Sequence, residues 1–378
     1  MKNNYNLYIT KERHRIMEKF LSLVLSRFGI EGEIESIRPI KTGHINQTNV
    51  VKMSGKKYTV QTINTYVFPD PEGVMENILS VTEHLRGKVA AQGGDPTREV
   101  LHFYATAEGK GCWKDEEGRY WRVYDFVDDA LTYDIADDLQ VLTDAGAAFG
   151  NFQKLLADYP GATLHETIVN FHNTKQRFIN FEAGVVRNAS GRADQAAAEI
   201  EFLRARAHKA TYLVDRIESG VLPLRVTHND TKFNNILIDK ATMKPLCVID
   251  LDTIMPGLAA YDFGDAIRFC ANSAAEDEKD LSKVTFCMDK YEAFAAGFIG
   301  GADGFFGEEE LDSMAWGALV ITLEQASRFL LDYLDGDKYF HTEYPDHNLV
   351  RARTQIKLAS EMEARFDEMQ AIVRKYAK

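Results

Sequence analysis

The pattern of apolar residues changes along the chain: short apolar runs predominate in the first part, and apolar residues at helical spacing predominate in the second. Before residue 129, short runs bounded by turn residues predict β-strands at residues 34–40, 49–53, 57–63, 100–105 and 120–126. Two segments with helical spacing, residues 11–28 and 72–89, flank the first three strands. After residue 129 the spacing is mainly helical, at residues 139–156, 170–183, 193–219, 279–297, 308–334 and 349–376.

This order predicts an α+β protein of two lobes. A small β-rich lobe with a leading helix, residues 1–127, precedes a larger and mainly helical lobe, residues 128–378. Residues 226–252 interrupt the helical pattern, because short apolar runs there end in polar residues. A chain of 378 residues is long enough for two separate cores.

Composition narrows the classes of partner. The net charge is −13, and no dense cluster of Lys and Arg is present, which argues against a nucleic-acid partner. No apolar stretch approaches the roughly 20 residues needed to cross a bilayer. The four cysteines are scattered and form no C-x-x-C pair, and the polar N-terminus is unlike a signal peptide. We therefore expect a cytoplasmic protein without a membrane or nucleic-acid partner, either a monomer or a weak homodimer.

The polar residues of the interrupting segment have a spacing that suits phosphoryl transfer. Residues 226–238 read VTHNDTKFNNILI, and Asp250 lies fifteen residues beyond Asn235. The carboxylate of Asp230 can accept a hydrogen bond from an attacking hydroxyl. The amide oxygen of Asn235 and the carboxylate of Asp250 are hard ligands suited to Mg²⁺, which neutralises the phosphates of ATP.

The pattern His-x-Asp-x-x-x-x-Asn followed by Ile-Asp-x-Asp resembles the aminoglycoside phosphotransferase and choline kinase branch of the protein-kinase-like fold. Within that branch the chain is most similar to the bacterial N-acetylhexosamine 1-kinases, which phosphorylate a sugar at its anomeric hydroxyl. Flanking segments carry this finer resemblance: residues 43–46 (GHIN), 58–61 (YTVQ), 249–257 (IDLDTIMPG) and 339–353, from YF to NLVRAR.

The resemblance implies a role for particular residues. Asp230 would be the catalytic base, Asn235 a metal ligand and Asp250 the principal metal ligand, with His228 bracing the loop. The loop containing Thr42, Gly43 and Asn46 would cover the phosphates of ATP. The sugar-binding residues would be His44, Asp230, Arg328 and Tyr339.

Three positions leave alternatives open. Protein kinases place a phosphate-binding lysine on the third strand, whereas this chain has Gln61 there and no lysine in register. Asp125 and Val127, where the lobes should join, would offer backbone groups to adenine, or would simply end a strand in the core. Asp252 would be either a second metal ligand or a hydrogen-bonding neighbour of the metal site.

Asp262-Phe263-Gly264 matches the metal motif of protein kinases by letter, but Asp250 fits the metal position better. We therefore expect Asp262 to cap a helix and Asp265 to brace the catalytic loop.

The leading hypothesis is an ATP- and Mg²⁺-dependent kinase that phosphorylates the anomeric hydroxyl of an N-acetylhexosamine or related hexose. One alternative is a kinase for an amine-bearing acceptor such as an aminoglycoside, choline or homoserine. Another is a pseudokinase that keeps the fold without catalysis. The set of Asp230, Asn235 and Asp250 speaks against the pseudokinase, and Arg328 near the acceptor would oppose a polycationic substrate.

Overall fold

The computed structural model describes residues 2–40, 45–133 and 137–377. The chain forms two compact units. The small unit comprises residues 1–130, 164–168 and 251–254, and the large unit comprises residues 131–163, 169–250 and 255–378.

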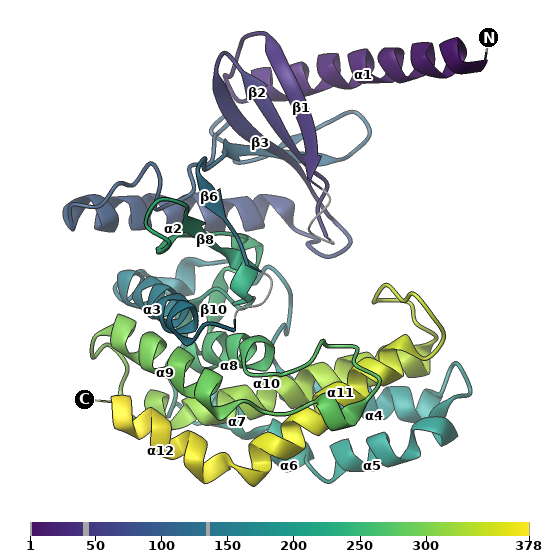
Figure 1. Ribbon diagram of the computed structural model, residues 1–378, viewed down its shortest axis with the longest axis vertical. Helices are drawn as coiled ribbons and strands as arrows, with labels where there is room; N and C mark the ends of the chain where they lie inside the picture. Colours follow the sequence, from purple (N-terminus) through teal and green to yellow (C-terminus); the bar gives the residue numbers. More distant parts are fainter. Residues whose placement is uncertain (1, 41–44, 134–136, 378) are drawn as a thin grey trace. The chain divides into compact units, whose positions relative to one another are not determined.

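The small unit is built on a five-stranded antiparallel sheet with the strand order β1-β2-β3-β5-β4. Figure 1 shows its first three strands side by side. Its strands are β1 (Ile34–Ile40), β2 (Thr48–Met53), β3 (Lys56–Ile63), β4 (Trp113–Lys114) and β5 (Tyr120–Asp125). Val60 and Val123 are fully buried in one cluster with Leu21 and Val24 of α1 (Lys2–Arg27). Because successive side chains alternate between the faces of a strand, Gln61 and Arg122 lie on the opposite face of the sheet.

Helix α2 (Pro71–Ala91) ties distant parts of the chain to the small unit. Asp70 caps its N-terminus by accepting a hydrogen bond from the amide of Gly73 at 3.0 Å. Asn77 of this helix donates hydrogen bonds to the carbonyl oxygens of His165 at 2.8 Å and Ile254 at 2.9 Å. Residues 164–168 and 251–254 are thereby attached to the small unit.

The strand expected at residues 100–105 does not form. Only an isolated bridge joins Phe103 to Tyr124. The amide of Tyr104 still donates to Val123, and the amide of Asp125 donates to His102. This stretch is therefore extended and follows the edge of β5 without a continuous ladder.

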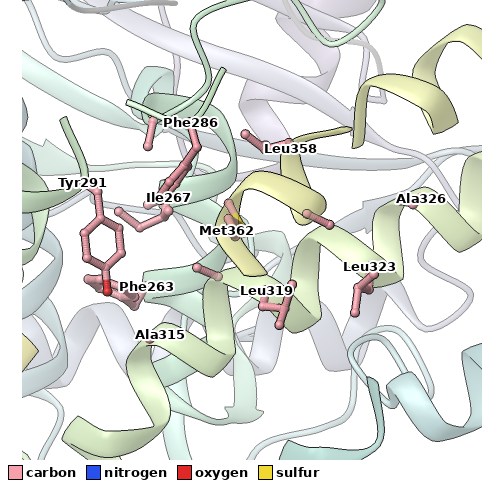
Figure 2. Close-up of a cluster of buried hydrophobic side chains, with 14 of the residues drawn as sticks. Phe263, Ile267, Phe286, Tyr291, Ala315, Leu319, Leu323, Ala326, Leu358 and Met362 are labelled. Atoms are coloured by element: carbon pink, nitrogen blue, oxygen red, sulfur yellow. The ribbon is translucent and has the colours of Figure 1, made fainter. Parts of the chain in front are cut away.

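The large unit is mainly helical, and α10 (Glu308–Asp335) is its longest helix. The other helices are α3 (Leu139–Leu155), α4 (Thr174–Arg187), α5 (Ala197–Arg204), α6 (Ala207–Ala210), α7 (Tyr212–Glu218), α8 (Ala259–Cys270), α9 (Met288–Ala302), α11 (His347–Ala364) and α12 (Phe366–Tyr376). Figure 2 shows part of the core, in which buried side chains of α8, α9, α10 and α11 meet: Phe263, Ile267, Tyr291, Leu319, Leu323, Leu358 and Met362.

Glycines allow two of these helices to approach closely. A Cβ atom on Gly264 of α8 would lie 2.3 Å from the backbone of Gly317, and one on Gly317 would lie 2.0 Å from the carbonyl oxygen of Ala260. Any larger residue at these positions would push α8 and α10 apart. The same crossing fixes α8, whose first turn carries Asp262.

Two short antiparallel pairs complete the large unit. Strand β7 (Arg225–Thr227) pairs with β10 (Met255–Gly257), and β8 (Ile236–Asp239) pairs with β9 (Pro245–Val248). Strand β6 (Ala130–Leu131) lies at the boundary between the units in the sequence. The loops that leave β7 and β9 carry the candidate catalytic residues.

The predicted α+β class is confirmed, with a small unit built on an antiparallel sheet and a larger helical unit. Two of the expected helices are broken. Residues 193–219 form α5, α6 and α7 in place of one helix, and residues 349–376 divide into α11 and α12 at Arg365. In the described part of the chain, no helix combines the length and apolar character required to cross a membrane.

Candidate active site

A single buried carboxylate holds the backbone of the loop between β7 and β8. Asp262 accepts hydrogen bonds from the amides of His228 at 3.0 Å and Asn229 at 2.7 Å. Burial raises the pKa of Asp262, and these hydrogen bonds offset only part of the rise. Asn229 has a φ of 63°, in the left-handed region that Asn tolerates better than most residues. The loop therefore turns sharply just before Asp230.

His228 connects this loop to the segment that precedes Asp250. Its Nε2 atom lies 2.8 Å from the carbonyl oxygen of Ile249, and its Nδ1 atom accepts a hydrogen bond from the amide of Asp230 at 3.3 Å. The imidazole is fully buried beside the rings of Phe149 and Phe152. Because Nδ1 is an acceptor here, the proton of the imidazole is on Nε2, which donates a hydrogen bond to the carbonyl oxygen of Ile249.

The carboxylate of Asp230 is paired with a cation and remains partly open to solvent. Its Oδ1 atom lies 3.0 Å from Nζ of Lys232, and its side chain is 22% exposed. Burial alone would raise the pKa of Asp230, but the charge of Lys232 and its hydrogen bond lower the pKa overall. An ionised and accessible carboxylate can accept a proton from a hydroxyl group.

Asn235 lies next to this carboxylate, and Asp250 follows a residue that is bound to Asn235. Nδ2 of Asn235 donates a hydrogen bond to the carbonyl oxygen of Asp230 at 2.8 Å. This bond fixes the orientation of the amide, whose Oδ1 atom is the oxygen that could bind a metal. The carbonyl of Asn235 accepts from the amide of Ile249 at 2.9 Å, which fixes the residue before Asp250. Asp250 has an exposed side chain and a φ of 62°.

This donor set fits magnesium held together with phosphates. Mg²⁺ commonly takes one or two protein carboxylates and completes its octahedron with phosphate oxygens and water. Within the part of the chain that the structure describes, no group of three or more His, Cys, Asp or Glu side chains forms a closed metal cage. Asn235 and Asp250 would thus hold the ion jointly with a nucleotide.

The structure brings Arg328 and Tyr339, two of the expected sugar contacts, into one neighbourhood of the large unit. The guanidinium of Arg328 lies over the ring of Phe340 at 5.6 Å, and the ring of Tyr339 meets Phe340 at 4.8 Å. Asp332 fixes the backbone at Tyr339 and Phe340 by accepting hydrogen bonds from their amides, at 2.8 Å and 2.9 Å.

A buried His–Glu pair links Arg328 to the loop between β7 and β8. Glu324 is 4.0 Å from Arg328 and 3.3 Å from Nδ1 of His172. Nε2 of His172 lies 3.2 Å from the carbonyl oxygen of Asn229, the residue before Asp230. A carbonyl oxygen only accepts hydrogen bonds, so Nε2 is the donor in this contact. Burial alone would lower the pKa of His172, but Glu324 raises it overall.

The expected nucleotide contacts fall in the small unit, and several lie outside the described residues. Thr42, Gly43 and His44 fall in residues 41–44, which are outside the described residues. Asn46 donates to Oδ2 of Asp252 at 2.7 Å, and both ends of the Gln61 amide have partners, Thr48 and Arg122.

Asp125 and Val127 end the sheet where adenine was expected. The carboxylate of Asp125 is bound by Lys56 at 2.8 Å, Tyr104 at 2.8 Å and His102 at 3.2 Å. Burial alone would raise the pKa of Asp125, but these hydrogen bonds lower it to about 2. Its amide donates to His102, whereas Val127 is a half-buried residue beyond the end of β5.

The sequence profile of the phosphotransferase enzyme family matches residues 36–296, which is more than half of the chain. The chain belongs to this family.

Solved structures of kinases and phosphotransferases have the same fold. A microcompartment-associated aminopropanol kinase is similar with a TM-score of 0.64 and 15% identity, over 93% of this chain and 98% of that one. An aminoglycoside phosphotransferase from Alicyclobacillus acidocaldarius gives a TM-score of 0.61 and 12% identity, over 93% and 96% of the two chains. Spectinomycin phosphotransferase APH(9)-Ia, solved with ADP and spectinomycin, gives a TM-score of 0.55 and 11% identity, over 91% of this chain and 98% of that one. These likenesses confirm the protein-kinase-like fold.

Several residues of this phosphotransferase were assigned wrongly or missed from the sequence. Helix α8 begins after Leu258, so Asp262 does not cap it and instead braces the catalytic loop. Asp265, expected in that bracing role, pairs with Arg268 at 3.1 Å. Lys232 stands in the core motif two positions after Asp230, a spacing that could have suggested the ion pair. The contact between His172 and Glu324 spans 152 residues and left no signal in the sequence.

Proposed function

We propose that this phosphotransferase is an ATP-dependent kinase that phosphorylates the anomeric hydroxyl of an N-acetylhexosamine or a related hexose. The resemblance of residues 249–257 and 339–353 to the N-acetylhexosamine 1-kinases supports the substrate class. The names of the similar structures point to amine-bearing acceptors, but their low identity supports only the fold.

The charge around Glu324 is the structural observation that favours a sugar over a polycation. The carboxylate of Glu324 interacts with three cationic groups, those of His172, Arg177 and Arg328. Burial and the neighbouring Arg328 lower the pKa of Arg177, as expected where like charges are close. The carboxylate of Glu324 is therefore already compensated by protein cations and is not open to the ammonium groups of an aminoglycoside or choline, whereas the guanidinium of Arg328 could donate hydrogen bonds to a neutral ring rich in hydroxyl groups.

In this proposal Asp230 accepts the proton of the anomeric hydroxyl as its oxygen attacks the γ-phosphorus. The bond from that phosphorus to the bridging oxygen breaks, and ADP leaves. Lys232 keeps Asp230 ionised before the transfer and balances the charge of its carboxylate. Magnesium held by Asn235 and Asp250 would neutralise charge on the phosphates.

The remaining proposed contacts orient the two substrates. Arg328, Tyr339 and His44 would offer hydrogen-bond donors and an aromatic face to the sugar. Six residues of the small unit would contact ATP: Thr42, Gly43, Asn46, Gln61, Asp125 and Val127.

A small panel of acceptors tests the substrate class. We expect ADP release with Mg²⁺·ATP and N-acetylglucosamine, N-acetylgalactosamine or galactose, and none above background with choline or kanamycin. The 1-O-methyl glycoside of the best sugar should inhibit without being phosphorylated, because it has no anomeric hydroxyl. Turnover of kanamycin or choline alone would overturn the sugar assignment, and phosphorylation of the methyl glycoside would move the reaction to another hydroxyl. Lack of turnover with any acceptor would favour a pseudokinase.

The acceptor side can be tested separately with Arg328→Ala. A site that binds particular hydroxyls loses about 1–3 kcal/mol when one partner is removed. The variant should raise the KM for sugar about tenfold and leave the KM for ATP unchanged. Arg187→Ala is a matched control, because Arg187 is an exposed arginine of the same unit that pairs with Asp335. Equal effects of the two variants would remove Arg328 from the sugar site.

A further inference from the structure

The small unit carries an arginine directly opposite Gln61. In the register of β3 and β5, Gln61 pairs with Arg122. Nε and Nη2 of Arg122 donate to Oε1 of Gln61 at 2.8 Å and 2.6 Å. Both side chains lie on the face of the sheet that turns away from α1, so strand β5 places a cation where β3 lacks one.

The same arginine forms a buried ion pair with Asp252. Nη1 of Arg122 donates to Oδ1 of Asp252, and Asn46 donates to Oδ2 at 2.7 Å. The side chains of Arg122 and Asp252 are 3% and 4% exposed. Both oxygens of the Asp252 carboxylate are therefore bound by protein donors, and its charge is compensated inside the unit.

This pair acts on a segment that starts beside a candidate metal ligand. Asp252 lies two residues after Asp250, and residues 251–254 belong to the small unit. The carbonyl of Ile254 is bound by Asn77 at 2.9 Å. Arg122 and Asn77 thus tether the four-residue segment at two points, and its backbone leads directly out of Asp250.

We propose that Arg122 and Asp252 form a positioning pair in a small unit whose third strand lacks the phosphate-binding lysine of protein kinases. Arg122 holds the carboxylate of Asp252 in the sheet, so Asp252 does not ligate the metal. The tethered segment instead fixes the backbone conformation from which Asp250 presents its carboxylate. The inference rests on the proposed role of Asp250 as a metal ligand and is independent of the acceptor.

Calorimetric titration with ADP, in Mg²⁺ and in EDTA, tests the pair without turnover. Arg122→Met and Asp252→Asn should each weaken binding of Mg²⁺·ADP by about tenfold or more, as is usual when a residue that orients a metal ligand is lost. Binding of ADP in EDTA and the KM for acceptor should change less than twofold, as roughly expected for groups that act through the metal alone.

The opposite hypothesis, that Asp252 ligates the metal, gives a different pattern. Arg122→Met would then free a carboxylate and leave Mg²⁺·ADP binding unchanged or tighter, while Asp252→Asn would resemble Asp250→Asn. That pattern would overturn the proposal. If the wild-type protein itself failed to bind Mg²⁺·ADP, the proposed kinase function would fail together with it.

Two further variants separate positioning from general destabilisation. Arg122→Lys keeps the charge but cannot bridge Gln61 and Asp252 at once, so it should stay folded and still lose part of the Mg²⁺·ADP affinity. Arg119→Met removes a neighbouring ion pair from the hairpin of β4 and β5, in which the half-exposed Arg119 binds the buried Asp115 at 2.7 Å. This control should bind Mg²⁺·ADP as the wild type does. Wild-type affinity in Arg122→Lys, or an equal loss in Arg119→Met, would refute the positioning role.

Discussion

At the scale of single residues, the proposed mechanism depends on the protonation state of Asp230. Lys232 lowers the pKa of this carboxylate against the opposing effect of burial. In the proposed mechanism this pair would meet two needs of a base, which must be sheltered from water and yet stay ionised at neutral pH.

Replacement of Asp230 by Asn should abolish most turnover and leave nucleotide affinity nearly unchanged. The amide keeps the shape of the side chain but cannot accept the hydroxyl proton, and a positioned base contributes about 10²–10⁴ in rate. Measurement of kcat with the best acceptor, beside calorimetry with Mg²⁺·ADP, checks both parts. A variant that kept more than about a tenth of the wild-type kcat would remove Asp230 from the role of base.

Replacement of Lys232 by Met should shift the acidic limb of the pH profile upward. If Asp230 is the base, its ionised form is the active one, so activity should fall as the pH drops through its pKa. Without Lys232, the main group that opposes the effect of burial is lost, and the pKa of Asp230 rises. A pH profile of kcat/KM for both proteins measures the shift, and an unchanged or lowered acidic limb would contradict the assignment.

At the scale of elements, sequence reasoning succeeded where one local pattern decided the outcome. Residues 34–40 and 308–334 were predicted almost to their ends, because alternation and helical period are local properties. The break at Arg365 was missed because the helical period continues on both sides of it. The chain turns there as Phe366 packs against Trp316 at 4.7 Å, a contact between residues 50 positions apart in the sequence.

The candidate site follows the same rule. Asp230, Asn235 and Asp250 form a motif with fixed spacing and could be named from the sequence. The contacts of Arg122 and Asp262 could not be predicted, because each binds a partner that only folding brings near.

The crossing of α8 and α10 gives a prediction for an element. Gly317→Ala should destabilise the protein by about 1–3 kcal/mol, because the added methyl group meets the backbone of Ala260 at 2.0 Å. Gly300→Ala is the matched control: its added Cβ meets nothing within 4 Å in α9, and helix propensity favours Ala by about 1 kcal/mol. Urea denaturation should show opposite signs for the two variants, and a neutral Gly317→Ala would show that the crossing can relax.

At the scale of the whole molecule, the pair of His172 and Glu324 makes stability depend on pH. The pKa of His172 is raised in the folded protein, so its contribution is fully present below its unfolded pKa of about 6.5 and is lost as pH rises through the folded value. The pKa of Glu324 is lowered, so its own contribution is lost only in acid.

His172→Gln should therefore destabilise the protein most near pH 6, by about 3–5 kcal/mol, since it leaves a buried carboxylate without its charged partner. The difference from wild type should shrink toward pH 9. Denaturant titrations of both proteins from pH 6 to pH 9 measure this trend. A difference that grew with pH would contradict the direction of the His172 shift.

The route of residues 251–254 also limits how the protein can be divided. A fragment that ended at Ala130 would contain Arg122 without Asp252, and Asn77 without the carbonyl groups of His165 and Ile254. Its sheet would then lack the carboxylate that compensates the guanidinium of Arg122 and the two carbonyl groups that bind Asn77. We therefore expect the small unit to reach its full stability only after residues 251–254 have been synthesised and have packed against it.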